Sequence, residues 1–245
     1  LTLTAAGSAY LEKCRVILNM VDAAESSLAE EKAVPRGRIR LGLPLSYGLQ
    51  ALMPVLLDFA DEQPFIELIM DLSDQRANLI EEGLDLSIRI TADLQPGDIV
   101  RKLGECRLLT LASPVYIAQH GELRHPSDLR HHECLIYASD TATSTWSYLE
   151  GGQSLQVPVR GRIVANNGAA LMEAAARGMG VACQPDFIAA PYLASGRVQQ
   201  VLQRYEIAPL GIYAVLPSNR YIPHRVSVLI EHLARVLGTS KHISP

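Results

Sequence analysis

The chain has 245 residues, of which 48% are hydrophobic and 20% charged, a balance that excludes a disordered or fibrous protein and is typical of one or two globular lobes. The 22 Lys and Arg residues and 26 Asp and Glu residues give a net charge of -4. Because neutralisation of nucleic-acid phosphates needs an excess of basic side chains, this charge argues against a surface that binds nucleic acid by itself. The sequence has no apolar run long enough for a membrane span and no signal-peptide pattern, so we expect a cytoplasmic protein without membrane contact.

The first part of the chain predicts a long helix with a narrow apolar seam. Thr4 is a suitable N-cap, and residues 5–32 contain no Pro and only one Gly. Seam residues recur at alternating spacings of three and four: Leu11, Cys14, Leu18, Val21 and Leu28, with Glu25 at the seam position between the last two. This heptad pattern is typical of a helix that pairs with another helix, so we expect self-association. The sequence Val-Pro-Arg-Gly at residues 34–37 ends the helix.

The following part of the chain alternates between strand and helix patterns. The predicted elements are a strand at Ile39–Leu43, a helix at Leu49–Phe59, a strand at Ile66–Leu72, a helix at Arg76–Glu82 and strands at Leu84–Ile90, Ile99–Leu103 and Arg107–Ala112. Strands that alternate with helices build parallel sheets through crossover connections. We therefore predict an α/β fold.

The second half repeats the same pattern. The predicted helices are Pro114–His120, Ala169–Arg177, Asp186–Ala190 and His224–Leu237, and the predicted strands are Cys134–Tyr137, Gln153–Arg162, Val181–Pro185 and Ile212–Leu216. No internal sequence repeat accompanies this second set of elements.

The sequence carries no recognisable catalytic or metal-binding motif. It lacks H-E-x-x-H, G-x-S-x-G and a phosphate loop that ends in G-K-[ST]. The glycines Gly178 and Gly180 follow a predicted helix and precede a strand, the reverse of the order in a dinucleotide site. The four cysteines have no zinc-like spacing, and Cys106 and Cys134 have no flanking motif that would favour a thiol sensor. We therefore predict no catalytic residue, no metal site and no cofactor.

Several polar residues lie at predicted strand ends, where open α/β sheets bind ligands. Ser46 lies between a strand and a helix, so its hydroxyl can cap the helix or face an anion. Arg89 lies in an apolar strand and needs either a structural partner, for which Asp85 is the candidate, or a ligand. Asn166 begins a turn before a helix, which turn chemistry also explains. Trp146, the only tryptophan, fits the core or one wall of an apolar pocket.

A set of motifs in a fixed order carries a resemblance to a known family. Residues 1–7 (L-T-L-T-A-A-G) precede the amphipathic helix, Ser46 precedes L-M-P-x-L-x-x-F at residues 52–59, and G-L-D-L-S-I-R-I occupies residues 83–90. Further motifs are A-S-P-x-Y at 112–116, P-x-D-L at 126–129, N-N-G-x-A-L at 166–171 and G-x-G-V-A-x-x-P at 178–185. Together they cover nearly the whole chain, and in this order they resemble the LysR-type transcriptional regulators.

The resemblance implies an effector-binding domain of the type 2 periplasmic-binding-protein kind, with two Rossmann-like lobes and a cleft, preceded by a long linker helix. The implied boundaries are 1–34 for the end of the wing and the linker (dimerisation) helix, 36–110 and 207–238 for lobe I, and 111–206 for lobe II. Two crossing strands, near Arg107–Ala112 and Glu206–Ile212, would join the lobes. Because the chain starts at Leu1 rather than Met, we expect a fragment that lacks most of the winged helix-turn-helix.

The resemblance also implies an effector site in the cleft. The residues carried over as ligand-binding candidates are Ser46, Tyr47, Arg89, Thr91, Asn166 and Phe187. Many relatives have Gly where this chain has Thr91, which adds a hydroxyl to the cleft. Helix N-termini at the strand ends, together with Arg89, favour a small anion such as a carboxylate-bearing metabolite.

The predicted function is that of a regulator, not an enzyme. A small-molecule effector would shift the geometry of a homodimer or homotetramer and so control DNA binding by the missing winged helix-turn-helix. The linker helix and the lobes can each supply an interface, so both oligomeric states stay open. A solute-binding protein of a transport system is the alternative; it would need an export signal and has no evident use for a heptad helix. An enzyme on the same fold would need a catalytic pair.

Overall fold

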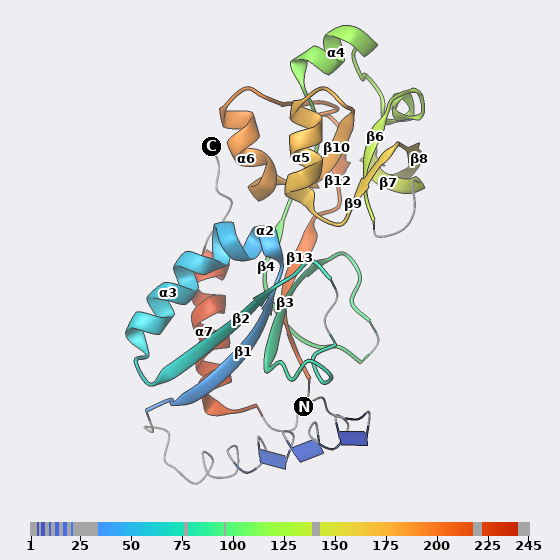
Figure 1. Ribbon diagram of the computed structural model, residues 1–245. Coiled ribbons are helices and arrows are strands. Elements are labelled where there is room, and N and C mark those ends of the chain that lie inside the picture. The colour runs from blue at the N-terminus through green and yellow to red at the C-terminus, as the bar shows by residue number, and fades with distance from the viewer. Residues whose placement is uncertain are drawn as a thin grey trace. The chain divides into compact units, whose positions relative to one another are not determined.

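The computed structural model covers residues 1–245. It describes residues 34–75, 78–95, 97–138, 143–217 and 222–239, and nine positions among the first 33: 4, 6, 7, 10, 13, 14, 17, 18 and 21. The chain divides into two units (Figure 1). Unit 1 contains the first strand, Ala51–Gly104 and the segment from Ile212, whereas unit 2 contains Leu45–Gln50 and Glu105–Gly211. The lobe boundaries expected after residues 110 and 206 stay predictions.

The predicted linker helix lies largely outside the described residues. At its start, the Gly7 backbone N–H donates to the Thr4 hydroxyl over 3.1 Å, which is the contact of a helix N-cap. Eight of the described positions up to Val21 are helical. The seam residues Leu18 and Val21 are 63% and 47% exposed, whereas the first and last seam positions lie outside the described residues. Pairing of this helix with a second one stays a prediction.

Unit 1 is built on a five-stranded sheet with the order β2-β1-β3-β13-β4. Its strands are β1 (Gly37–Leu43), β2 (Ile66–Leu72), β3 (Leu86–Thr91), β4 (Ile99–Cys106) and β13 (Leu210–Leu216). β1 runs parallel to both of its neighbours, with Leu41 opposite Met70 of β2 and Leu86 of β3. Alternation along β1 buries Ile39, Leu41 and Leu43, as expected for a strand in the middle of a sheet.

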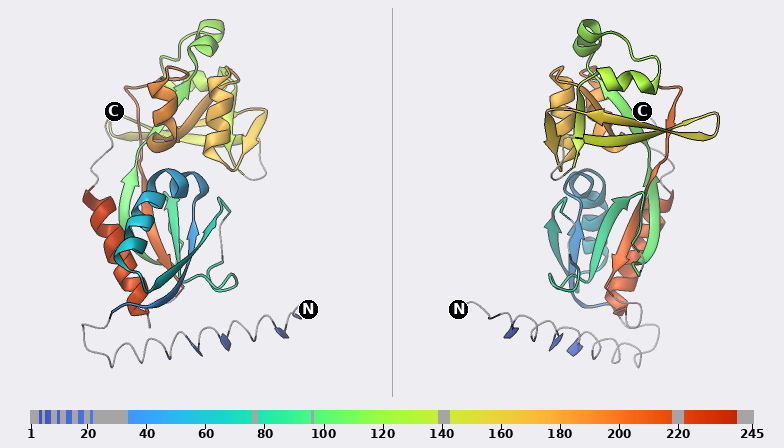
Figure 2. Two further views of the ribbon diagram at one scale, coloured as in Figure 1. Left: turned by 60° about the vertical axis from the view of Figure 1, so that its left-hand side comes forward. Right: turned by 90° about the vertical axis from the view of Figure 1, so that its right-hand side faces the viewer.

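Two helices of unit 1, α3 (Met53–Glu62) and α7 (His224–Thr239), pack against each other (Figure 2). α3 also contacts β2, and α7 contacts β1. The buried face of α7 consists of apolar side chains at spacings of three and four: Val226, Leu229, Ile230 and Leu233. This periodicity, which predicted the helix from the sequence, places one face of α7 in the core.

The helix predicted at Leu49–Phe59 begins in an irregular way. α2 (Leu45–Tyr47) leads into a π-helical turn, η1 (Gly48–Leu52), and α3 follows. Pro54 has no backbone N–H and cannot donate to the carbonyl four residues before it, so the α-helical hydrogen-bond ladder is interrupted at this point. Wider turns of this kind often lie at functional sites.

The helix predicted at Arg76–Glu82 is wrong in the part that the structure describes. Residues 79–83 form turns, closed by the Leu84 N–H, which donates to the Leu79 carbonyl over 2.8 Å. Gly83 has a φ of 64°, a left-handed conformation that stops helical structure. A single turn fixes several backbone dihedrals for one hydrogen bond and does not propagate unless more residues follow. The next strand therefore starts later than predicted.

Unit 2 contains a second five-stranded sheet with the order β11-β5-β10-β6-β9. Its strands are β5 (Leu108–Ala112), β6 (Cys134–Tyr137), β9 (Ile163–Ala165), β10 (Val181–Pro185) and β11 (Gln199–Gln200). β10 and β6 are parallel, as predicted, and β9, a strand that was not predicted, is parallel to β6, but β5 is antiparallel to β10 and β11. Helices α5 (Gly168–Ala176) and α6 (Asp186–Ala194) stand side by side against this sheet (Figure 1). Unit 2 also contains α4 (Pro114–His120), the 3-10 helix η2 (Pro126–His131) and the short helix α2.

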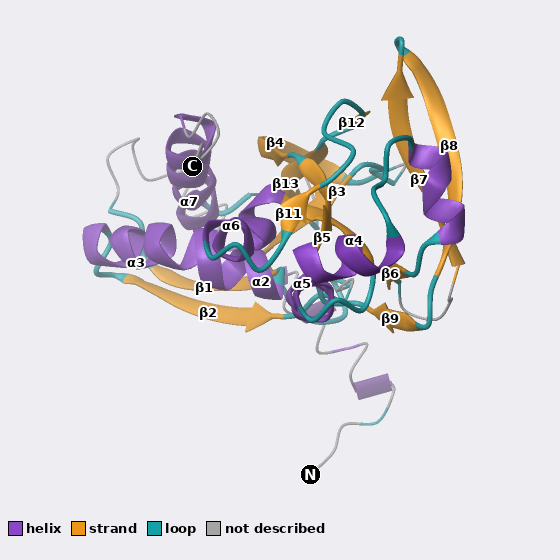
Figure 3. Cartoon of the chain, turned by 90° about the horizontal axis from the view of Figure 1, so that it is seen from above, coloured by secondary structure: helices purple, strands orange, loops and turns teal. Residues whose placement is uncertain are grey.

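A smaller antiparallel sheet with the order β12-β7-β8 completes unit 2. Its strands are β7 (Thr143–Glu150), β8 (Gln153–Arg160) and β12 (Glu206–Ile207), and Figure 3 shows β7 and β8 as a long two-stranded ribbon. Gly151 and Gly152, with φ of 58° and 82°, form the tight turn between them. Only the second strand was predicted, although a Gly-Gly pair between alternating runs is the sequence signal of a hairpin. Trp146 of β7 packs partly buried against the core of unit 2.

Candidate functional site

The N-terminal end of α5 brings together two polar residues from distant parts of the sequence. Asn167 is the N-cap of α5, and its side-chain oxygen accepts a hydrogen bond from the Ala170 N–H over 3.0 Å. Its side-chain nitrogen donates to Ser46 Oγ over 3.4 Å. Ser46 lies inside α2 and is 9% exposed, so it is not a helix cap. The predicted Asn166 is the exposed residue before the cap, and the amide that lies against Ser46 is therefore that of Asn167.

An aromatic pair adjoins this polar pair. Tyr47, the residue after Ser46, is 6% exposed and meets the ring of Phe187 edge to face, with 4.9 Å between the ring centroids. Burial, reinforced by Cys106 and Asp186, raises the pKa of the Tyr47 hydroxyl to about 12. The hydroxyl is therefore protonated at neutral pH and available as a hydrogen-bond donor.

The first turn of α6 holds Phe187 in place. The Phe187 N–H donates to Asp186 Oδ1 over 2.9 Å, and the Asp186 carboxylate lies 3.3 Å from Arg107 Nε. A carboxylate at a helix N-terminus compensates the partial positive charge there. α5, by contrast, has no acidic residue in its first turn. The N-terminal end of α5 is therefore the better place for an external anion.

A polar side chain that the sequence analysis missed lies against the same end of α5. Gln184 of β10 is 1% exposed, and among the described residues its Nε2 has no hydrogen-bond partner. A Cβ atom added to Gly168, the first residue of α5, would overlap Gln184 Oε1. The sequence signal was one amide in the otherwise apolar strand Val181–Pro185.

The two predicted site residues of unit 1 have partners within that unit. Arg89 Nη1 lies 3.7 Å from Asp98 Oδ1, and the two side chains are 16% and 18% exposed. The Thr91 hydroxyl donates to the Asp93 carbonyl over 2.9 Å and accepts from the Asp93 N–H over 3.1 Å. Asp85, the expected partner of Arg89, accepts a backbone N–H of β1 over 2.8 Å. The Asp98 carboxylate is thus one partner of the Arg89 guanidinium.

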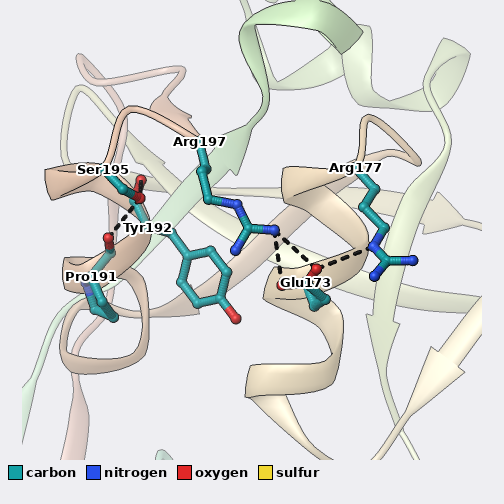
Figure 4. Close-up of polar contacts among 6 residues, drawn as sticks. All are labelled: Glu173, Arg177, Pro191, Tyr192, Ser195 and Arg197. Carbon is teal, nitrogen blue, oxygen red and sulfur yellow. Dashed lines mark hydrogen bonds and ion pairs between the residues drawn. The ribbon is translucent and has the colours of Figure 1, made fainter.

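A surface network fixes α5 to the segment that follows α6 (Figure 4). The Glu173 carboxylate accepts hydrogen bonds of 2.9 and 3.0 Å from Arg197 and one of 3.1 Å from Arg177. These hydrogen bonds lower the pKa of Glu173. The Arg197 guanidinium also lies 5.2 Å from the centroid of the Tyr192 ring. Arg197 thus joins α5 to the segment after α6, whereas Arg177 pairs with Glu173 four residues earlier, at the end of the same helix.

A hollow elsewhere in unit 2 contains none of the predicted site residues. It has a volume of about 550 Å³ and is lined by Arg130, Thr143, Ser144, Thr145, Pro158, Val159 and Arg160. In the part of the chain that the structure describes, no group of three or more His, Cys, Asp or Glu residues is arranged to hold a metal ion. None of the described helices combines the length and the apolar character of a membrane span.

Comparison with known protein sequences identifies relatives along nearly the whole chain. Residues 32–238 match the family described as the LysR substrate binding domain. An HTH-type transcriptional regulator of Xanthomonas campestris pv. campestris (strain 8004) is 32% identical over 240 residues, which amount to 96% of this chain and 70% of that regulator.

Solved structures show the same similarity. The full-length Vibrio cholerae virulence activator AphB, a member of the LTTR family, aligns with a TM-score of 0.71 and 26% identity over 96% of this chain and 81% of its own. The regulatory domain of CrgA, a LysR-type regulator from Neisseria meningitidis, aligns with a TM-score of 0.71 and 26% identity over 83% of this chain and all (100%) of its own. With the α/β content of both units, these neighbours confirm the predicted two-lobed, periplasmic-binding-protein-like fold class. The chain belongs to the LysR-type transcriptional regulators, and residues 32–238 carry the family's effector-binding domain.

Proposed function

We propose that the chain binds a small-molecule effector at the N-terminal end of α5, in contact with Ser46, Tyr47, Asn167 and Phe187. The observation that supports this most is the hydrogen bond between Ser46 and Asn167, which are 121 positions apart in the sequence. It sets a hydroxyl and an amide beside an uncompensated helix end and an aromatic pair. A few convergent polar groups at an apolar wall are typical of small-molecule sites.

The chemistry of these groups favours a small anion such as a carboxylate-bearing metabolite. α5 has nine residues, and the N-terminal end of such a helix presents unpaired N–H groups and partial positive charge. The neutral hydroxyl of Tyr47 and the hydroxyl of Ser46 can donate further hydrogen bonds. Arg89 and Thr91 stay predictions from the family resemblance.

A thermal-shift screen of metabolites against the purified chain tests this proposal, because a ligand of the folded state raises its stability by mass action. Once the screen has identified a ligand, the Ser46→Ala variant tests the site, because it lacks one hydrogen bond to the charged group of the ligand. We expect calorimetry to show an affinity about tenfold lower, which corresponds to ~1.4 kcal/mol. Ser147→Ala, at an exposed position of β7, is the matched control. Equal affinity of Ser46→Ala and the wild type contradicts the site.

For the whole regulator, we propose that the effector changes DNA binding by a cytoplasmic homodimer or homotetramer. A ligand moves such an equilibrium only if it binds one arrangement of the protomers better than another. Sizing at low concentration tests the oligomer, and a strict monomer contradicts it. DNA affinity of the full-length regulator, measured with and without the ligand, tests the coupling, and equal values contradict it. A solute-binding protein is not favoured, since the relatives are transcriptional regulators.

A further inference from the structure

The most unusual side chain of unit 2 is the buried amide of Gln184. It is 1% exposed, and its Nε2 finds no hydrogen-bond acceptor among the described residues. Two residues that precede it in β10, Val181 and Ala182, are fully buried and apolar. A buried amide donor without an acceptor is unfavourable compared with an apolar side chain of the same shape. Its presence in a core strand therefore requires a physical reason.

Gly168 determines where this amide lies. A Cβ at Gly168 would overlap Gln184 Oε1 and would stand 2.6 Å from Ile188 Cδ1, so both side chains pack directly on this glycine. The N–H groups of the first turn of α5 favour the oxygen end of the amide on their side. The NH₂ end is therefore the one without a partner. The residue before Gly168 is Asn167, whose own amide donates to Ser46.

We propose that Gln184 Nε2 donates a hydrogen bond to a carboxylate oxygen of the effector, and that it selects ligands that carry a carboxylate. This inference rests on the proposed effector-binding function and adds to it a specificity-determining residue. A site built to hydrogen-bond one ligand group discriminates strongly against ligands that lack it, because the buried donor is then left unpaired. If the role of the amide were purely structural, its substitution would lower the thermal stability of the protein instead of raising it.

The first experiment measures stability without any ligand. Gln184→Met keeps the length of the side chain and removes its polar end. If the amide serves a ligand, the variant loses an unsatisfied donor and its melting temperature rises by about 2–4 °C. If a buried water satisfies the amide, the variant loses that interaction and melts at a lower temperature, which overturns the proposal. Gln156→Met, at an exposed position of β8, is the matched control and leaves the melting temperature unchanged.

The second experiment measures binding with matched probes. Acetate, succinate and benzoate are titrated by calorimetry against the wild type, each beside its neutral amide: acetamide, succinamide and benzamide. We expect at least one carboxylate to bind, and to bind tenfold or more tightly than its amide. Gln184→Met reduces that affinity at least tenfold. Gln184→Glu keeps the shape but replaces the donor with a negative charge, so it abolishes carboxylate binding.

The results separate this inference from the proposed function. In one outcome, a neutral metabolite binds the wild type, its affinity falls in Ser46→Ala, and no carboxylate binds. This outcome supports the site and overturns the role of Gln184. Carboxylate binding that is lost in Gln184→Met but unchanged in Ser46→Ala supports Gln184 and overturns the role of Ser46. Unchanged carboxylate affinity in both Gln184 variants overturns the inference, whatever the melting temperatures show.

Discussion

The hydroxyl pair Thr110–Tyr148 provides a quantitative test of the packing that supports the site. The two oxygens lie 2.9 Å apart, in a buried hydrogen bond that joins β5 to β7. Tyr148 is fully buried and Thr110 is 3% exposed. Tyr148→Phe keeps the ring and removes only the hydroxyl, so it leaves the Thr110 hydroxyl buried without this partner.

The expected loss follows from burial. A buried hydroxyl that loses its partner costs about 1–3 kcal/mol, which is a large part of a typical domain stability of about 5–15 kcal/mol. With a loss of about 2 kcal/mol and a urea dependence of about 2 kcal/mol per molar, the unfolding midpoint should fall by roughly 1 M. Thr110→Val, which is isosteric, should have a similar effect. The double variant should lose less than the sum of the two, with a coupling of about 1 kcal/mol, because neither orphaned hydroxyl remains.

Urea unfolding of the four proteins at neutral pH, followed by circular dichroism, measures this cycle. Thr145→Val, at an exposed position of β7, is the control and should change the unfolding free energy by less than about 0.5 kcal/mol. Additive losses in the double variant, or a Tyr148→Phe protein as stable as the wild type, would show that the Thr110–Tyr148 hydrogen bond does not stabilise the fold.

Three further predictions concern other contacts. Gly161→Ala places a Cβ onto the backbone carbonyl of Cys134, so urea unfolding should show a loss of more than about 3 kcal/mol, and wild-type stability would contradict the packing. Burial raises the pKa of the Cys134 thiol to about 12, so the thiol deprotonates first in the unfolded chain. From about pH 9 to 12 this thiol should add up to ~1.4 kcal/mol per pH unit to the fall in the free energy of unfolding; the same slope in Cys134→Ala as in the wild type refutes this. Asp98→Asn removes the partly buried partner of Arg89, and should lower the unfolding free energy by about 1 kcal/mol, with a smaller loss in high salt; a loss that does not depend on salt contradicts an ion pair.

For elements with a clear burial pattern, the first and last residues could be predicted from the sequence. The strands Ile66–Leu72, Cys134–Tyr137 and Val181–Pro185 and the helix Pro114–His120 lie where predicted. Each is bounded by a strong local signal, such as Ser113, whose side chain accepts from the backbone as the N-cap of α4. Local chemistry alone determines where such elements start and stop.

Elements that depend on partners elsewhere could not be predicted in this way. β7 has small polar residues on its exposed side and becomes a strand because β8 pairs with it along its whole length. The antiparallel direction of β5 depends on β10, which lies about 70 positions later in the chain. Residues 79–83 have helical composition, but Gly83 closes the turn before a helix can propagate.

The candidate site was predicted only in outline, for the same reason. The turn before α5 indicated a polar position, but only the cap geometry shows that Asn167, rather than Asn166, reaches Ser46. The contact of Arg89 with Asp98 was not predicted, because Asp98 lies beyond the end of the strand that carries Arg89. Gln184 is inconspicuous in the sequence, since only its burial and its unpaired nitrogen reveal it.

We propose that a small-molecule effector binds where the Ser46 segment meets the start of α5. Hydrogen–deuterium exchange of the backbone amides, with and without the ligand that gives the largest thermal shift, tests it most directly. Ligand binding should add protection in Leu45–Leu52 and in the first turn of α5, and none around the hollow lined by Arg130 and Arg160. Protection confined to that hollow, or absent from both the Ser46 segment and α5, would rule out this binding site.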